Sequence, residues 1–165
     1  EPLQHLIRHE GPFDFGIAFD GDADRVGFVD ERGEIVPMDL ITALIAQTML
    51  KRQQGPIFYD LRSSKAVAEA ITESGGTPMM SRVGHAFIKR QMRDADALFA
   101  GELSGHYYFR ENFFTESSAL AVIYVANLVS AGQQPLSSLI EPLRRYAPSG
   151  EINSKVADVD AVFAR

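Results

Sequence analysis

The segment PIFYDLRSSKAVAEAITESGGTPMMSRVGHAFIKRQMRDADALFA, residues 56–100, alternates short apolar runs with segments whose apolar residues recur at helical spacing. Apolar runs of four to seven residues bounded by turn residues are typical of buried strands, and Gly75-Gly76 is a common helix terminator. We expect strands at 56–60, 77–83 and 97–100, and helices at 64–74 and 85–94. Strands that alternate with helices predict a parallel α/β core.

The flanking sequence extends this pattern. We expect helices at 39–54, with Asp39 as the N-cap, at 116–130 and at 135–146, a strand at 151–156, and two short strands within 15–30. The chain opens inside a helical pattern and closes just after another helix begins near Ala161. We therefore expect an internal piece of a longer protein.

The acidic sequence FDGDADR, residues 19–25, joins the two strands within 15–30. In an extended backbone, side chains two positions apart point the same way, so Asp20, Asp22 and Asp24 can converge. Three carboxylates so close repel one another unless a hard divalent cation such as Mg²⁺ binds them. Arg25 adds a positive charge that suits an anion held beside the metal.

Two other interpretations of this acidic sequence compete with a metal site. One is a solvated turn, which acidic residues with glycine often form. The other is an EF-hand loop, but that loop needs glycine at its sixth position, where this chain has Arg25. An EF-hand loop also lies between two helices, whereas the acidic sequence lies between two predicted strands. We favour a strand–loop–strand Mg²⁺ site.

Composition limits the class of protein. The chain has 165 residues, of which 45% are hydrophobic and 23% charged, and a net charge of −6. This acidic balance argues against non-specific nucleic-acid binding, and no apolar run approaches the roughly 18 residues of a membrane span. The absence of cysteine fits a reducing compartment, so we expect a cytoplasmic protein with neither nucleic acid nor membrane as a partner.

Two further motifs indicate a polar ligand. SRVGH, residues 81–85, lies where a strand gives way to a helix, and such junctions favour anions, although a lone histidine there is more often a packing residue. In GELSGH, residues 101–106, the alternating side chains of Glu102, Ser104 and His106 would face one side of an extended loop and suit sugar hydroxyls. The alternative is a polar hairpin edge.

Together, DGDADR (20–25), RVGH (82–85) and GELSGH (101–106) resemble the α-D-phosphohexomutase family, in particular its bacterial phosphomannomutase/phosphoglucomutase branch. The resemblance implies a layered, mixed, mostly parallel sheet with helices on both faces, preceded by a strand–loop–strand fragment. It also implies a division into the end of domain 2 (1–34), domain 3 (35–145), and a linker with the start of domain 4 (146–165).

The family interconverts hexose 1-phosphates and 6-phosphates with Mg²⁺, through a phosphoserine and a hexose bisphosphate. The resemblance implies that Asp20, Asp22 and Asp24 bind the metal. It implies catalytic roles for Arg25, Arg62, His85 and His106, and substrate contacts for Arg62, Gly84, His85, Glu102, Ser104 and His106.

The chain departs from the family pattern in three respects. Arg62 stands where related enzymes often have a lysine, and because a guanidinium stays protonated, it favours electrostatic stabilisation over proton transfer. Leu103 stands where methionine is common. The phosphoserine segment matches nothing here, so we expect this chain alone to be inactive and to need domains 1, 2 and 4 of its polypeptide. A phosphoglucosamine mutase fragment, or a sugar- or metal-binding module without turnover, is the alternative.

Overall fold

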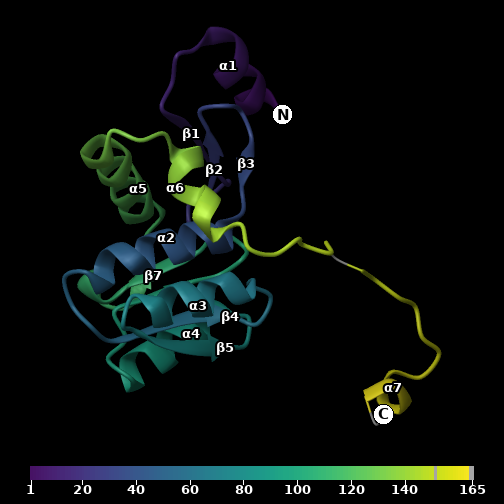
Figure 1. Cartoon of the computed structure of the whole chain (residues 1–165). Coiled ribbons are helices and arrows are strands. Elements are labelled where there is room, and N and C mark those ends of the chain that lie inside the picture. The colour runs from purple at the N-terminus through teal and green to yellow at the C-terminus, as the bar shows by residue number, and fades with distance from the viewer. Residues whose placement is uncertain (151, 164–165) are drawn as a thin grey trace.

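The computed structural model describes residues 1–150 and 152–163 and contains two sheets (Figure 1). The first sheet is antiparallel, in the order β1 (Phe15–Phe19), β2 (Val26–Asp30) and β3 (Ile35–Val36). Helix α1 (Pro2–Glu10) packs on β1 through the buried Ile7. The expected strand–loop–strand fragment is therefore a hairpin, and its acidic loop is not flanked by the helices of an EF-hand.

The second sheet has five strands in the order β5-β4-β6-β7-β8. Its strands are β4 (Pro56–Asp60), β5 (Thr77–Ser81), β6 (Phe99–Gly101), β7 (Tyr107–Phe109) and β8 (Thr115–Glu116). Strand β4 pairs in parallel with both β5 and β6, whereas β6, β7 and β8 pair antiparallel. The central strands are thus parallel, and a small antiparallel extension makes the sheet mixed.

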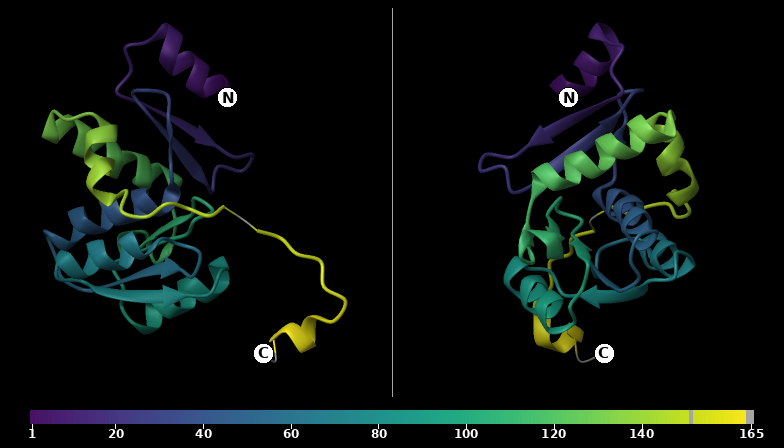
Figure 2. Two further views of the ribbon diagram at one scale, coloured as in Figure 1. Left: turned by 45° about the vertical axis from the view of Figure 1, so that its right-hand side comes forward. Right: turned by 90° about the vertical axis from the view of Figure 1, so that its left-hand side faces the viewer.

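Helices cover both faces of this sheet (Figures 1 and 2). Along β4, Ile57 and Tyr59 face the core shared with helices α2 (Met38–Leu50), α3 (Lys65–Glu73) and α5 (Ser118–Gly132), whereas Phe58 faces α4 (His85–Asp94). This alternation follows from the two-residue period of a strand. The α/β class with a layered, mixed sheet and helices on both faces is confirmed.

Helix α2 lies in the middle of the molecule. It packs against α3, α5 and strand β6, and every residue from Asp39 to Ala46 is buried. Phe28 and Val36 of the first sheet belong to the same apolar core as this helix. The hairpin that carries the acidic loop is therefore fixed to the α/β layers by a shared core.

The boundaries of several predicted elements were wrong. Pro37, not Asp39, precedes α2, and the carboxylate of Asp39 accepts hydrogen bonds from the backbone N–H groups of Leu40 and Ser64. Helix α2 ends at Leu50 rather than at Gln54. Strands β3, β7 and β8 were not predicted, because two or three residues are too few to show a period.

The C-terminal predictions also failed in part. The expected helix at 135–146 is a short α6 (Leu136–Ile140) followed by the 3₁₀ turn η2 (Glu141–Leu143), since Pro142 cannot continue an α-helix. Residues 152–156 form no strand, and residue 151 of that predicted strand lies outside the described residues. Helix α7 (Val159–Phe163) lies away from the body of the molecule (Figure 1). None of the described helices combines the length and the apolar character that crossing a membrane requires.

Candidate functional site

The acidic loop, residues 20–25, closes the hairpin between β1 and β2. It is bent rather than extended, because the Ala23 N–H donates to the Asp20 carbonyl over 3.3 Å and Ala23 has a φ of 59°. Carboxylate oxygens of Asp20, Asp22 and Asp24 nevertheless all lie within 4.8 Å of one another. The predicted convergence is present, but a turn produces it, not strand alternation.

Arg25 partly neutralises this loop. Its Nε lies 2.8 Å from Asp20 Oδ2 and 3.6 Å from Asp24 Oδ1, and its backbone N–H donates to Asp20 Oδ1 over 3.2 Å. Burial acts to raise the pKa of Asp20, but the hydrogen bond and charge of Arg25 outweigh it and lower that pKa. The carboxylate is therefore held in its charged form.

One oxygen in the loop suits a cation. Asp24 Oδ1 is buried and has no hydrogen-bond partner among the described residues. Buried oxygens of this kind call for a ligand, and clustered carboxylate oxygens are the donors that Mg²⁺ prefers. The three aspartates thus fit a hard divalent cation.

Two contacts hold the acidic loop and the start of β2 against helix α5 and the loop between β6 and β7. The Ser118 hydroxyl, at the start of α5, donates to the Ala23 carbonyl over 2.6 Å. The Val26 N–H donates to the Gly105 carbonyl over 3.1 Å. Gly105 has a φ of +92°, and a Cβ there would lie 3.0 Å from the Val26 carbonyl oxygen. Glycine is required at this position for the two loops to approach each other.

The hairpin loop, residues 101–106, connects β6 to β7. The Glu102 N–H donates to the His106 carbonyl over 3.0 Å, so the segment is a tight turn and not the extended loop that alternation suggested. His106 Nδ1 lies 2.9 Å from the Ser104 hydroxyl, and Nε2 lies 3.2 Å from Asp24 Oδ2. Because a carboxylate only accepts, Nε2 carries the proton in that contact. The imidazole therefore joins the hairpin loop to the acidic loop.

Glu102 is more deeply buried than a side chain on an open loop would be, with 2% of it exposed. Its Oε1 accepts from the Gly84 N–H over 3.1 Å, and Oε2 accepts from the Tyr108 hydroxyl over 2.7 Å. Burial and the contact with Glu102 raise the pKa of Tyr108, so its hydroxyl remains a donor. Glu102 thereby joins the hairpin loop to the start of helix α4.

Arg62 follows the end of β4. Its Nη2 and Nε donate to Asp60 Oδ2 over 2.7 and 3.2 Å, and the Leu103 N–H donates to the same oxygen over 2.9 Å. Arg62 is therefore connected to the hairpin loop through one buried carboxylate.

His85 is the first residue of α4 and is exposed, next to Gly84 with its φ of +126°. Two cations near His85 already have partners: Lys89 pairs with Glu116 at 2.9 Å, and the Arg82 guanidinium lies 3.8 Å from the Phe87 ring centre.

The contacts bring most of the expected residues together. Arg62, Gly84 and the hairpin loop follow the carboxyl ends of the parallel strands β4, β5 and β6, where open α/β sheets usually bind ligands. The acidic loop meets them through His106. Asp60, Tyr108 and Ser118 also take part in these contacts and were not predicted from the sequence. Asp60 could have been found, because an acidic residue ends a buried strand there, but the partners of Tyr108 and Ser118 come from distant segments.

Known proteins resemble this chain closely. Residues 37–146 match the family described as phosphoglucomutase/phosphomannomutase, alpha/beta/alpha domain III. A phosphomannomutase of Methanocaldococcus jannaschii is 47% identical over 161 residues, which cover 96% of this chain and 36% of that protein. A phosphomannomutase of Salmonella typhimurium is 41% identical over 92% of this chain and 34% of its own length.

A crystal structure shows the same arrangement. The phosphoglucomutase/phosphomannomutase family protein of Burkholderia thailandensis superposes with a TM-score of 0.81 at 30% identity, over 89% of this chain and 32% of that one. The chain thus spans about a third of the length of the relatives it matches. Because the family match covers most of its residues, the chain belongs to the phosphoglucomutase/phosphomannomutase family.

Proposed function

We propose that the protein containing these residues is a phosphohexomutase that interconverts the 1-phosphates and 6-phosphates of mannose and glucose. The observation that carries this proposal is the contact between His106 and Asp24, which joins a cluster of three carboxylates to a loop of sugar-binding character. Phosphoryl transfer to a sugar hydroxyl needs both parts in one place: charge neutralisation for the phosphoryl group and a group that removes the hydroxyl proton.

We propose that Asp20, Asp22 and Asp24 hold Mg²⁺. When bound, Mg²⁺ would neutralise charge on the transferring phosphoryl oxygens. Arg25, whose guanidinium is half exposed beside these carboxylates, would donate to the same phosphoryl group. The phosphoryl donor would be a phosphoserine outside the 165 residues, and for that reason this chain alone would not turn over.

His106 Nδ1, which carries no proton while Nε2 donates to Asp24, would accept the proton of the attacking hydroxyl through the Ser104 hydroxyl 2.9 Å away: the sugar hydroxyl gives its proton to Ser104 as Ser104 gives its own to Nδ1. The imidazole lies between two carboxylates, with Asp24 Oδ2 at 3.2 Å from Nε2 and Glu102 Oε2 at 3.4 Å from Nδ1. Ser104, hydrogen-bonded to the same ring, would hold it in orientation and offer its hydroxyl to the sugar.

The remaining residues would bind the substrate. Glu102 keeps unused lone pairs on both oxygens after accepting from Gly84 and Tyr108, and one of them would accept a sugar hydroxyl. Arg62, with 40% of its side chain exposed, would bind phosphate through its positive charge and its free N–H groups, without transferring a proton. Gly84 and His85 would approach the same anion at the start of α4.

We propose that residues 1–34 are the end of domain 2, 35–145 are domain 3, and 146–165 lead into domain 4. The family match, which begins at residue 37, supports a first boundary close to this position, and the three-stranded sheet extends two residues past residue 34, to Val36. The partners would then be hexose phosphates and bisphosphates, together with the other domains of the same polypeptide.

The test is an assay of the complete protein with Mg²⁺ and a hexose bisphosphate on mannose 1-phosphate, glucose 1-phosphate and glucosamine 1-phosphate. We expect conversion of the first two to their 6-phosphates, and His106→Ala should lower kcat by about 100-fold or more, the usual contribution of general acid–base catalysis. His9→Ala, at an exposed position on α1, is the matched control and should change nothing. Wild-type rates in His106→Ala would refute its role, and preference for glucosamine 1-phosphate would favour the phosphoglucosamine branch.

A further inference from the structure

Asp60 is a buried carboxylate to which the proposed function assigns no role. It is the last residue of β4, which lies between β5 and β6, and its exposed fraction is 0%. Oδ1 accepts from the Arg62 backbone N–H at 2.9 Å and from the Ser63 hydroxyl at 3.3 Å. Oδ2 accepts from the Arg62 guanidinium and, at 2.9 Å, from the Leu103 N–H.

We propose that Asp60 is a positioning residue that fixes the Arg62 guanidinium relative to the hairpin loop, 101–106. This inference rests on the proposed function, in which Arg62 binds phosphate and the hairpin loop binds the sugar. Asp60 touches neither ligand. It sets the distance between the two groups that do, so that the phosphate and the ring of one substrate are bound as a unit.

The geometry of Arg62 supports this role. Nε and one N–H of Nη2 face Asp60 Oδ2, so the guanidinium plane is anchored along one edge. Its opposite edge, with Nη1, remains available to an anion, and the side chain is 40% exposed. An arginine already held in one orientation loses less conformational entropy when it binds phosphate.

The contact with Leu103 separates Asp60 from an ordinary turn-forming aspartate. Asp30 offers a comparison within the same chain: it ends β2, is 1% exposed, and also precedes an arginine by two residues. Its Oδ1 accepts from the N–H groups of Arg32 and Glu34, which belong to its own turn. Asp60 instead reaches a residue 43 positions away, on a loop that Arg62 does not otherwise contact through any hydrogen bond among the described residues.

The experiment is a double-mutant cycle in the complete protein, with Asp60→Asn, Arg62→Ala and their combination, assayed on mannose 1-phosphate. Asparagine keeps the shape of the side chain but has no negative charge. One of its two terminal groups is also an NH₂ donor, which cannot accept from the N–H groups of Arg62 and Leu103. We expect Asp60→Asn to lower kcat/KM at least about tenfold. The kcat/KM of the double variant should lie within about threefold of that of Arg62→Ala, because the effects of residues that act as a unit do not add. Asp30→Asn is the matched control and should leave kcat/KM unchanged.

A second readout does not depend on activity. In a ¹H–¹⁵N spectrum of the complete protein, the Arg62 Nε–H signal, assigned by its loss in Arg62→Ala, and the Leu103 amide signal should both change in Asp60→Asn and persist in Asp30→Asn. Inactivity of the wild-type protein would overturn the proposed function, and the spectrum would still decide the role of Asp60.

If the loss of kcat/KM in the double variant equals the product of the losses in the two single variants, Asp60 has only a general structural role. The same conclusion follows if Asp30→Asn lowers kcat/KM as much as Asp60→Asn does. It also follows from an unchanged Arg62 signal in Asp60→Asn. If Asp60→Asn does not fold, as judged by circular dichroism, the same cycle with Asp60→Glu, which keeps the charge but moves the carboxylate outward by one methylene group, gives the same decision.

Discussion

The two carboxylate oxygens of Asp24 face different groups. Oδ2 accepts from His106, whereas Oδ1 is buried near Arg25 without a hydrogen bond among the described residues. Substitution of Asp24 would therefore disturb the imidazole and the metal ligands together. Asp22, the exposed member of the three, allows the metal to be tested by itself.

Asp22→Asn in the complete protein should weaken Mg²⁺ binding by about tenfold or more, since even indirect partners of a metal contribute that much. Isothermal titration with Mg²⁺ measures the change. Asp14→Asn is the control, because Asp14 is an exposed aspartate outside the acidic loop. Equal Mg²⁺ affinity in wild type and Asp22→Asn would contradict the assignment of this ligand.

For individual residues, the sequence predicts which side chains lie close together, but it does not predict the backbone conformation that brings them together. Strand alternation predicted the convergence of the aspartates and of Ser104 with His106, yet both loops are turns. The burial of Glu102 could not be predicted either, since its partners, Gly84 and Tyr108, are set by the packing of α4 and β7. Local patterns carry no information on such long-range contacts.

Among the elements, helix α2 has the greatest influence on the position of the site. Asp39, the second residue of α2, accepts from the Ser64 N–H and so fixes the loop that carries Arg62. The Tyr107 hydroxyl of β7 donates to the Met38 carbonyl over 3.2 Å. The helix has apolar residues on every side because it lies between a sheet and other helices.

Ile41→Ala should lower the free energy of unfolding by about 2–5 kcal/mol, because it leaves a cavity at a position with no exposed surface. Ile123→Ala, on α5, removes the same atoms from a side chain that is 52% exposed and should cost much less. Urea unfolding followed by circular dichroism measures both. Similar losses in the two variants would mean that α2 is less central to the core than its burial indicates.

The long elements were predictable because they repeat a period several times. Strands β4 and β5 and helices α3, α4 and α5 lie within a few residues of their predicted positions. The antiparallel strands β7 and β8 escaped prediction, since aromatic residues 107–109 are equally compatible with any buried segment. They are strands because the hairpin loop returns the chain alongside β6.

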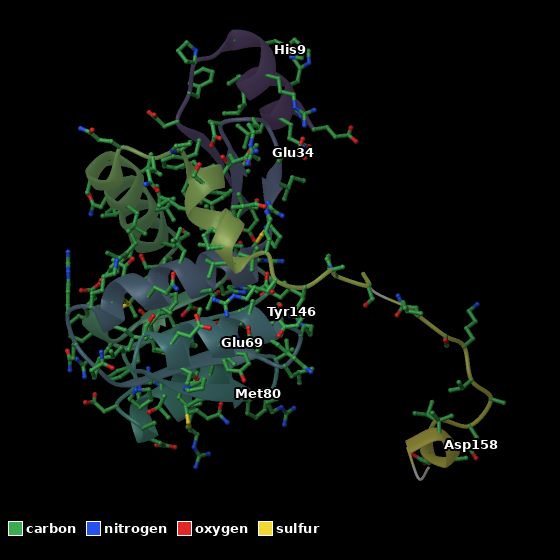
Figure 3. All side chains as sticks on the ribbon, in the orientation of Figure 1. His9, Glu34, Glu69, Met80, Tyr146 and Asp158 are labelled. Carbon is green, nitrogen blue, oxygen red and sulfur yellow. The ribbon has the colours of Figure 1, made fainter. Side chains whose placement is uncertain are left out.

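For the molecule as a whole, the exit of the chain from the α/β layers is held by a cluster of charges. Arg145 donates to Glu69 over 3.0 Å and to Glu73 over 2.6 and 2.7 Å. The Tyr146 hydroxyl also donates to Glu69, and both of these residues are labelled in Figure 3. Arg145 and Tyr146 precede the segment that leads away from the body, and both glutamates lie on α3. The cluster therefore fixes the point from which any following domain would extend.

This cluster should make stability depend on pH in acid. The hydrogen bond from Tyr146 and then that from Arg145 lower the pKa of Glu69, and the hydrogen bond from Arg145 lowers the pKa of Glu73, both from an ordinary value of 4.5. A carboxylate whose pKa is lowered on folding adds stability that is fully present above its unfolded pKa and is lost as the pH falls through the folded value.

Arg145→Gln should therefore be less stable than wild type at pH 7, with a difference that shrinks below about pH 4.5. Urea unfolding at pH 7, 5 and 3.5 measures it, and Arg144→Gln, which removes the same charge from a contact of 4.0 Å, should show no such trend. A difference that stays constant or grows in acid would mean that the glutamates do not stabilise the exit of the chain through their charges.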